Sequence, residues 1–269
     1  MRVAVDLYVR RQSWLHATDP RVKLLAVAVG LVILLAFKNL YVMLTVLIGL
    51  HVVHWSASIP REKILFVWRT LLPISIMIAT LWIVFYPSGT PILEFWLIKV
   101  TPLSVAQGLA LALRINAMAL LVFAWLYTTD NNELVLSLVK LRLPYSWGLV
   151  LSLALRYIPT FQATYGMISD AQQARGLRIS EESGFKRVRV MMPIFVAMVI
   201  SALRTSEDLA KALEARGFGL VGTHRTFFRD LDFRGLDWLY TGTLLSAAAV
   251  MIYLNLSYSF GQHVLRLFP

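Results

Sequence analysis

The chain has no cysteine at any of its 269 positions. A disulfide framework and a thiolate metal site are therefore excluded. Charge is also scarce, because Asp, Glu, Lys and Arg make up 15% of the residues, against about a quarter in soluble domains. Acidic residues are the scarcer kind, with 15 Asp and Glu against 26 Lys and Arg. These absences argue against both a secreted disulfide-rich domain and an ordinary soluble globular protein.

Several motifs of nucleotide binding and catalysis are missing as well. The sequence has no G-x-x-x-x-G-K-[ST] phrase, so a P-loop for ATP phosphates is excluded. It has neither G-x-S-x-G nor H-E-x-x-H. His51 and His54 lie three residues apart and could form a pair of metal or haem ligands. Because Trp55 follows them near the end of an apolar run, we interpret them as interfacial residues and expect no metal site and no catalytic residue.

Apolar residues dominate what is present. They make up 58% of the chain, and the mean hydropathy is +0.67. Runs near the length of a bilayer span predict an integral membrane protein made of helices. We expect five spans, at 22–38, 40–57, 64–86, 103–128 and 236–260. The first two are short and reach the length of a span only if Lys23 and Lys38 snorkel to the interface.

The Lys and Arg residues predict the orientation. Of the 26, 22 lie in the first 23 residues, in 61–69 and in 129–235, on one side of the five-span topology. Positive loops face the cytoplasm, so we expect a cytoplasmic N-terminus and an external C-terminus. This bias accounts for the net charge of +11 without a nucleic-acid partner. No apolar h-region follows the first charges, so we expect no cleavable signal and a first span that stays in the protein.

The segment 129–235 is mostly polar and is expected to form a domain of its own. It lies between residues 1–128, which hold the first four spans, and residues 236–269, which hold the last span. It is predicted to hold a short amphipathic helix at 131–140, entered through Thr129 or Asp130 with Glu133 in a capping box. Two longer helices are predicted at 146–177 and 185–217. Pro159 is expected to break or kink the first, and Pro193 to kink the second or to lie in its first turns.

The apolar run 190–203 lies inside the second long helix. Its 14 residues are short for a span, and basic residues flank it on both sides. We interpret it as part of a helix along the cytoplasmic boundary. A sixth span is the alternative.

The phrase A-x-x-A-R-G occurs twice, at 171–176 and 212–217. Each copy is typical of a helix C-terminus, where Arg offsets the partial negative charge and Gly takes the left-handed conformation that closes the helix. The Ala residues three apart leave one helix face clear for close approach. A guanidinium at a helix tip is a planar fork suited to carboxylates and carbonyls. Two copies on the cytoplasmic side therefore indicate docking of Arg175 and Arg216 to a partner with two sites.

Arg114 lies within the fourth predicted span. Charges inside a membrane are costly and mark functional candidates. No acidic residue in the predicted spans is an obvious partner for it. A functional role, pairing with backbone carbonyls and snorkelling outward all remain open for this residue.

Several phrases, taken in order, resemble the transmembrane T component of energy-coupling factor (ECF) transporters over nearly the whole chain. They are Asp19-Pro20-Arg21-Val22-Lys23-Leu24-Leu25, Ala112-Leu113-Arg114 with Thr128-Thr129-Asp130 and Glu133-Leu134, Leu155-Arg156-Tyr157-Ile158-Pro159, Ala171–Gly176 and Asp208–Gly217. Asn131 departs from the pattern, since relatives often have Pro there.

The resemblance implies an all-α, polytopic protein of the cell membrane with a cytoplasmic domain of long crossing helices. Such a protein links two cytoplasmic ABC-type ATPase subunits to a small substrate-binding membrane subunit in an importer of vitamins or metal ions. It implies that this chain is not an enzyme and binds no cofactor, because ATP and Mg are used by the partner ATPases. The alternatives are a conventional ABC permease with its own substrate pathway and a metal-dependent membrane enzyme using His51 and His54.

The resemblance also assigns site residues. The ATPase-docking residues would be Ala174, Arg175, Gly176, Ala215, Arg216 and Gly217. Contact with the substrate-binding subunit and lipid would involve Met191, Met192, Phe195 and Met198, because flexible Met side chains suit adaptable surfaces. Burial of 190–203 against the chain's own spans is the alternative. Arg114 and Arg156 are further structural or functional candidates.

Overall fold

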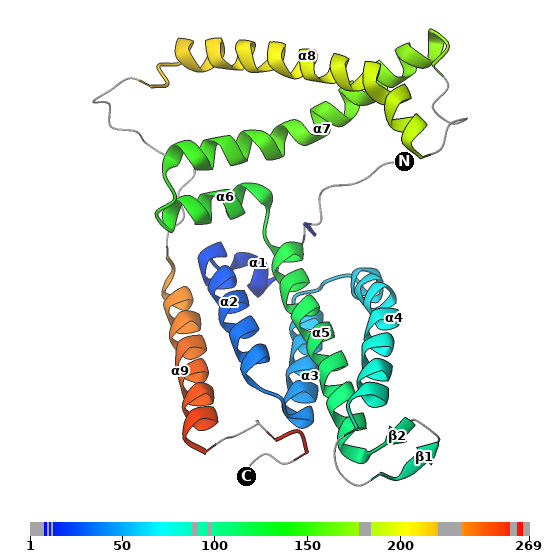
Figure 1. Ribbon diagram of the computed structural model, residues 1–269. Helices are drawn as coiled ribbons and strands as arrows, with labels where there is room; N and C mark the ends of the chain where they lie inside the picture. Colours follow the sequence, from blue (N-terminus) through cyan, green and yellow to red (C-terminus); the bar gives the residue numbers. More distant parts are fainter. Residues whose placement is uncertain are drawn as a thin grey trace. The chain divides into compact units, whose positions relative to one another are not determined.

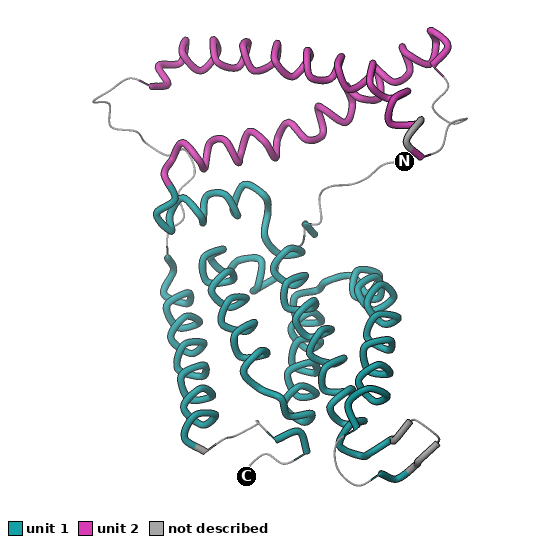
Figure 2. The backbone as a smooth tube through the Cα atoms, in the orientation of Figure 1, with its two compact units in different colours: residues 1–143, 231–269 teal, residues 144–230 magenta. Residues whose placement is uncertain are grey.

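The computed structural model describes residues 8–9, 11, 13–87, 91–95, 98–177, 184–219, 233–258 and 263–265. The chain divides into two compact units (Figure 2). Unit 1 is Met1–Leu143 with Leu231–Pro269, and unit 2 is Pro144–Asp230. The expected middle domain, 129–235, is wider than unit 2, because residues 129–143 and 231–235 belong to unit 1.

Unit 1 is a bundle of helices (Figure 1). Its helices are α1 (Trp14–Ala17), α2 (Pro20–Ala36), α3 (Leu40–Ser56), α4 (Arg61–Phe85), α5 (Pro102–Thr128), α6 (Asn131–Lys140) and α9 (Gly235–Tyr258). Each expected apolar run and the short helix at 131–140 are thus confirmed as helices. In the described part of the chain, four helices are long and apolar enough to cross a membrane, namely α4, α5, α9 and a helix of unit 2. With the 17-residue α3 as a shorter apolar helix, the structure is that of a multi-pass membrane protein.

Helix α5 lies at the centre of unit 1 and packs against α2, α3 and α4. Its close approach to α4 depends on Gly108, where an added Cβ would lie 2.9 Å from the Ala79 carbonyl oxygen. A hydrogen bond links the same two helices, because Asn116 Nδ2 on α5 donates to Ser75 Oγ on α4 over 2.6 Å. The buried core combines apolar side chains of α5 with those of α2, its C-cap, α3 and α4: Leu34, Phe37, Val42, Met43, Leu47, Val67, Ala117 and Leu120.

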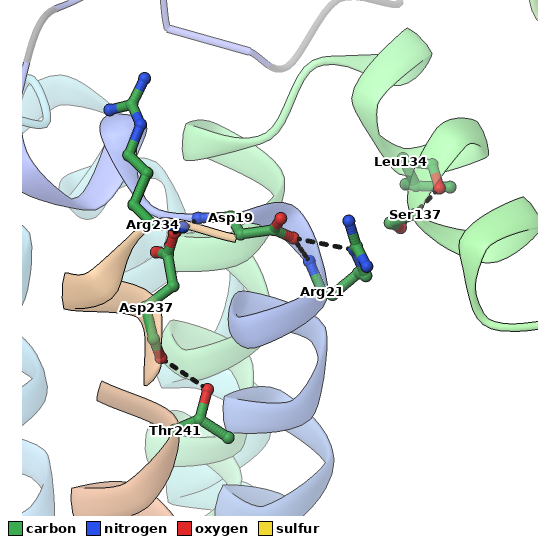
Figure 3. Close-up of polar contacts among 7 residues, drawn as sticks. All are labelled: Asp19, Arg21, Leu134, Ser137, Arg234, Asp237 and Thr241. Carbon is green, nitrogen blue, oxygen red and sulfur yellow. Dashed lines mark hydrogen bonds and ion pairs between the residues drawn. The ribbon is translucent and has the colours of Figure 1, made fainter. Parts of the chain in front are cut away.

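The N-termini of α2 and α9 are joined by two buried carboxylates (Figure 3). Asp19 caps α2, because its Oδ1 accepts a hydrogen bond from the Arg21 amide at 2.8 Å. The same oxygen forms an ion pair with Arg21 Nε at 3.3 Å. Asp237 Oδ1 accepts from the Asp19 amide at 3.1 Å, and its Oδ2 accepts from the Arg234 amide at 3.0 Å. Helix α9 is thereby joined to α2, although the two bonded residues are 218 positions apart in the sequence.

Lys23 does not snorkel, which corrects the sequence-based expectation. Its side chain is 4% exposed, and its Nζ donates to the Thr128 carbonyl at 2.8 Å and to the His16 carbonyl at 3.3 Å. The free carbonyls at the end of α5 need donors, and an ammonium group supplies them. Lys38, at the other end of α2, is exposed as expected.

Local structure differs from expectation at two further places. Asp130 is the N-cap of α6 but makes no side-chain capping bond, so the capping box with Glu133 is wrong. A reciprocal box instead begins α5, between Thr101 and Ser104. The loop between α4 and α5 holds two short antiparallel strands, β1 (Leu93–Phe95) and β2 (Ile98–Val100), with Glu94 opposite Lys99. This hairpin is the only strand pairing in the described part of an otherwise helical protein.

Unit 2 consists of two long helices, α7 (Tyr145–Ala174) and α8 (Phe185–Ala215), that pack against each other and cross (Figure 1). Both confirm the predicted helices. Pro159 and Pro193 lie inside them without ending them, so α7 does not break at Pro159. At 1.5 Å per residue each helix is about 45 Å long.

Candidate functional site

The two Ala-Arg-Gly phrases end the two helices of unit 2. Helix α7 ends at Ala174 with Arg175 as its C-cap, and α8 ends at Ala215 with Arg216 as its C-cap. The next residues have left-handed backbone, with φ of 92° at Gly176 and 72° at Gly217. The glycines therefore occupy the position where a Cβ is unfavourable.

The hydrogen bonds that close the two helices match one another. At the first end, the Gly176 amide donates to Gln173 O at 2.9 Å and the Leu177 amide to Gln172 O at 3.0 Å. At the second end, the Gly217 amide donates to Glu214 O and the Phe218 amide to Leu213 O, both at 2.9 Å. Each pair is a Schellman motif. The repeat in the sequence is thus a repeat in backbone structure.

Both arginines are presented at the surface of these ends. Arg175 and Arg216 are exposed, as are Ala174 and Ala215. Among the described residues neither guanidinium has an ion-pair partner. The two ends lie at opposite ends of unit 2 (Figure 1). We call residues 174–176 and 215–217 the two tips, and each offers a planar cation to a partner.

The backbone at the first tip leads to a test with a matched control. We expect Gly176→Ala to lower the free energy of unfolding by about 1 kcal/mol, because alanine is strained in the left-handed region. Gly166→Ala, in the interior of α7, should raise it by about 0.5–1 kcal/mol, since alanine is the better helix former. An added Cβ meets nothing within 4 Å at either position, so crowding does not contribute. Denaturant unfolding of the purified variants measures both, and equal shifts of one sign would contradict the cap assignment.

One face of α8 carries an apolar stripe that faces away from the unit's interior. Its members are between 42% and 63% exposed: Val188, Met192, Phe195, Val196, Val199 and Leu203. They recur at three- and four-residue intervals, which places them on one side of the helix. Ile194, on the opposite side of α8, is 2% exposed. We call these six residues the α8 stripe.

Of the four residues expected to contact a membrane partner, two are exposed and two are half-buried. Met192 and Phe195 belong to the α8 stripe, whereas Met191 and Met198 are half-buried beside it. The sequence-based prediction omitted Val188, Val196, Val199 and Leu203, because it rested on the flexibility of methionine side chains. The helical period of the apolar residues would have identified them.

The two remaining arginine candidates lie in different surroundings. Arg156 is exposed on α7. Arg114, on α5, is half-buried and donates from Nη2 to the Phe37 carbonyl at the end of α2. Of the alternatives for Arg114, pairing with a backbone carbonyl is the one observed. Its Nε is buried and has no hydrogen-bond partner in the described part of the chain.

His51 and His54 do not converge on a common point. Each Nδ1 donates to the carbonyl four residues earlier, at 2.8 Å in both cases. Trp68 Nε1 donates to His51 Nε2 over 3.0 Å, so both ring nitrogens of His51 are engaged. No group of three or more metal-ligating side chains occurs among the residues searched, which are those the structure describes. The geometry thus explains both histidines as hydrogen-bonded parts of the bundle.

Comparison with known proteins identifies the family of this chain. The family model CbiQ, described as cobalt transport protein, matches residues 11–226. A transmembrane protein EcfT of the energy-coupling factor transporter from Listeria innocua is 32% identical over 260 residues, covering 93% of this chain and 96% of the relative. The EcfT protein of Bacillus subtilis is 31% identical over 268 residues, covering 93% and 97%. That of Brevibacillus brevis is 32% identical over 247 residues, covering 87% and 91%. The chain therefore belongs to the CbiQ family, the transmembrane energy-coupling subunits of ECF transporters.

Proposed function

We propose that this chain couples ATP hydrolysis to import by linking two cytoplasmic ABC-type ATPase subunits to a small substrate-binding membrane subunit. The cargo class is vitamins or metal ions, selected by the substrate-binding subunit. The observation that carries the proposal is the pair of equivalent tips, each with an exposed arginine beyond a Schellman-capped helix. Two tips at opposite ends of one unit suit a partner made of two similar bodies (Figure 1).

Each tip is suited to dock in a groove of one ATPase. A helix C-terminus is partly negative and would repel an acidic groove, and the arginine reverses that sign locally. The guanidinium can then make paired charge-assisted hydrogen bonds to a carboxylate. Ala174 and Ala215 leave room for close approach beside it. Arg175 and Arg216 are the proposed contacts, and the two glycines keep the arginines at the ends of their helices.

The α8 stripe is the proposed contact for the substrate-binding subunit. Exposed contiguous apolar side chains on a helix mark an interaction surface, and Met192 and Phe195 are its most central large members. Although α8 is long and apolar enough to span a membrane, a crossing would place the two tips on opposite sides. We therefore propose that α8 lies at the cytoplasmic boundary, with its stripe against the partner and lipid.

Force would pass along the two long helices. The proposed sequence is that ATP binding closes the ATPase pair, the docked tips move with it, and α7 and α8 turn that movement into reorientation of the substrate-binding subunit. Pro159 and Pro193, which each remove a hydrogen bond inside a helix, are the proposed hinges. No P-loop occurs in this chain, so we propose that it is non-catalytic, that it binds no cofactor, and that ATP and Mg are held by the partners.

The orientation can be tested with the cysteine-free chain itself. We expect single cysteines at the exposed positions 173 and 214, introduced as Gln173→Cys and Glu214→Cys, to react with a membrane-impermeant thiol reagent only from the cytoplasmic side. Lys99→Cys, between α4 and α5, should react only from outside. The measurement is labelling of intact cells against inverted vesicles. Opposite labelling at positions 173 and 214 would contradict the boundary position of α8 and the two-tip docking together.

A further inference from the structure

Unit 1 contains a cavity in which positive groups gather without a counter-charge from its described lining residues. Its volume is about 220 Å³, and its polar lining consists of Lys38, Trp82, Gln107 and Arg114. Lys38 lies between α2 and α3, Trp82 on α4, and Gln107 and Arg114 on α5. No Asp or Glu is among the lining residues. The cavity thus holds two cationic side chains within a bundle that spans the membrane.

Arg114 is held in place with bonding capacity to spare. One of its terminal nitrogens donates to the Phe37 carbonyl, which orients the guanidinium. A guanidinium has five N–H donors, and one donor, Nε, has no partner among the described residues. The described part of the chain gives it no ion pair either. A permanently charged group in this position is costly until an anion joins it.

Gln107 is oriented to donate as well. Trp82 Nε1 lies 3.2 Å from Gln107 Oε1. An indole N–H can only donate, so the atom of Gln107 that faces it must be the oxygen. The amide nitrogen of Gln107 is then the terminal atom not bonded to Trp82, on a side chain that lines the cavity. The polar lining is therefore composed of donors: an ammonium, a guanidinium and an amide.

An apolar groove adjoins this cavity. It is lined by Ile78, Leu81, Trp82, Phe85 and Tyr86 of α4, with a volume of about 490 Å³. Trp82 lines both spaces, and its ring stacks on Tyr86 with 4.6 Å between centroids. Leu81 and Phe85 are exposed on this face. A donor-rich cavity beside an apolar groove fits a ligand that has an anionic group and a hydrocarbon chain.

We propose that this face of unit 1 binds an anionic phospholipid, with the phosphate in the cavity between Lys38 and Arg114 and an acyl chain in the α4 groove. Free phosphate would use the cavity but not the groove. A carboxylate of another membrane subunit would use the cavity without needing lipid. The shared Trp82 wall and the open apolar groove on a membrane-facing helix favour the lipid.

The test uses the full chain, delipidated in a neutral detergent and titrated with phosphatidylglycerol, phosphatidylcholine or inorganic phosphate. The readouts are the thermal unfolding midpoint and lipid retained in native mass spectrometry. We expect phosphatidylglycerol to raise the midpoint and to be retained as about one molecule per chain. Phosphatidylcholine should bind about tenfold more weakly, because its net charge is zero.

Variants locate the site. Lys38→Gln removes an exposed cation from the rim and should weaken phosphatidylglycerol binding about tenfold, as expected for loss of one charge-assisted hydrogen bond. Lys99→Gln, in the β1–β2 hairpin, removes the same charge outside the cavity and should leave binding unchanged. Arg114→Lys keeps the charge but loses the fork, and should also weaken binding.

Three results would overturn the proposal. The first is that inorganic phosphate raises the unfolding midpoint as much as phosphatidylglycerol does. The second is that phosphatidylcholine and phosphatidylglycerol bind equally well. The third is that Lys38→Gln and Arg114→Lys bind phosphatidylglycerol as the unaltered chain does. Loss of a co-purifying membrane subunit in Lys38→Gln, with lipid binding unaltered, would assign the cavity to a protein carboxylate instead.

Discussion

The double variant Arg175→Ala, Arg216→Ala is expected to insert in the membrane normally and to lose the ATPase partners proposed above. Each arginine stands exposed at a capped helix end and would supply a charge-assisted contact of about 1.5–3 kcal/mol. Loss of one contact therefore weakens ATPase binding by roughly tenfold to a hundredfold, and loss of both reduces co-purification of the ATPases below detection. The measurement is the amount of ATPase retained on the tagged chain, with substrate uptake measured in parallel.

The control for this experiment lies on the same helix. Arg204 is exposed on α8 but away from the tip, so Arg204→Ala removes the same charge and should leave ATPase binding within about twofold of wild type, as for a surface charge. Gly176→Ala provides a second comparison, because it disturbs the cap while keeping the arginine. Full ATPase binding and uptake in the double variant would contradict tip docking. Equal losses in Arg204→Ala would reduce the effect to net charge alone.

The variant Phe195→Glu is expected to abolish association with the substrate-binding subunit while leaving ATPase binding intact. Phe195 is 63% exposed within the α8 stripe, so the substitution costs the folded chain little. In an apolar interface, however, an unpaired carboxylate costs several kcal/mol, which corresponds to a loss of affinity of at least about a hundredfold. Co-purification of the two kinds of partner with the same tagged chain measures both effects at once.

Met167→Glu is the matched control for the stripe. Met167 is 66% exposed and lies on α7, so the change in charge and the starting exposure are nearly the same. Retention of the substrate-binding subunit by Met167→Glu, with its loss in Phe195→Glu, supports the assignment to α8. If the two variants behave alike, the apolar surface of unit 2 has no preferred face and the stripe is not the contact.

Much of the helical architecture could be predicted because it depends on local patterns. Apolar runs of near-bilayer length predicted α4, α5 and α9, and the A-x-x-A-R-G phrase predicted where α7 and α8 end. A Schellman cap involves only about six consecutive residues. Its presence at 171–176 and 212–217 is therefore a property of short sequence segments, and the structure confirms it.

Contacts between distant segments could not be predicted in the same way. Lys23 was expected at the interface because only its own helix was considered, whereas the carbonyl that it satisfies belongs to Thr128. The buried pair of Asp19 and Asp237 joins residues 218 positions apart. In both cases a polar side chain is buried because another helix end supplies its partner.

The sequence by itself determined that this is a multi-span helical membrane protein and that two of its helices end in equivalent arginine tips. Span length, helix period and caps are all set by neighbouring residues, so they can be recognised without a fold. Only the tertiary structure decided that the tips lie at opposite ends of one unit, that the α8 stripe is left uncovered, and that Arg114 meets the Phe37 carbonyl. Those features depend on which helices pack together, and packing is decided by the whole chain rather than by any one segment of it.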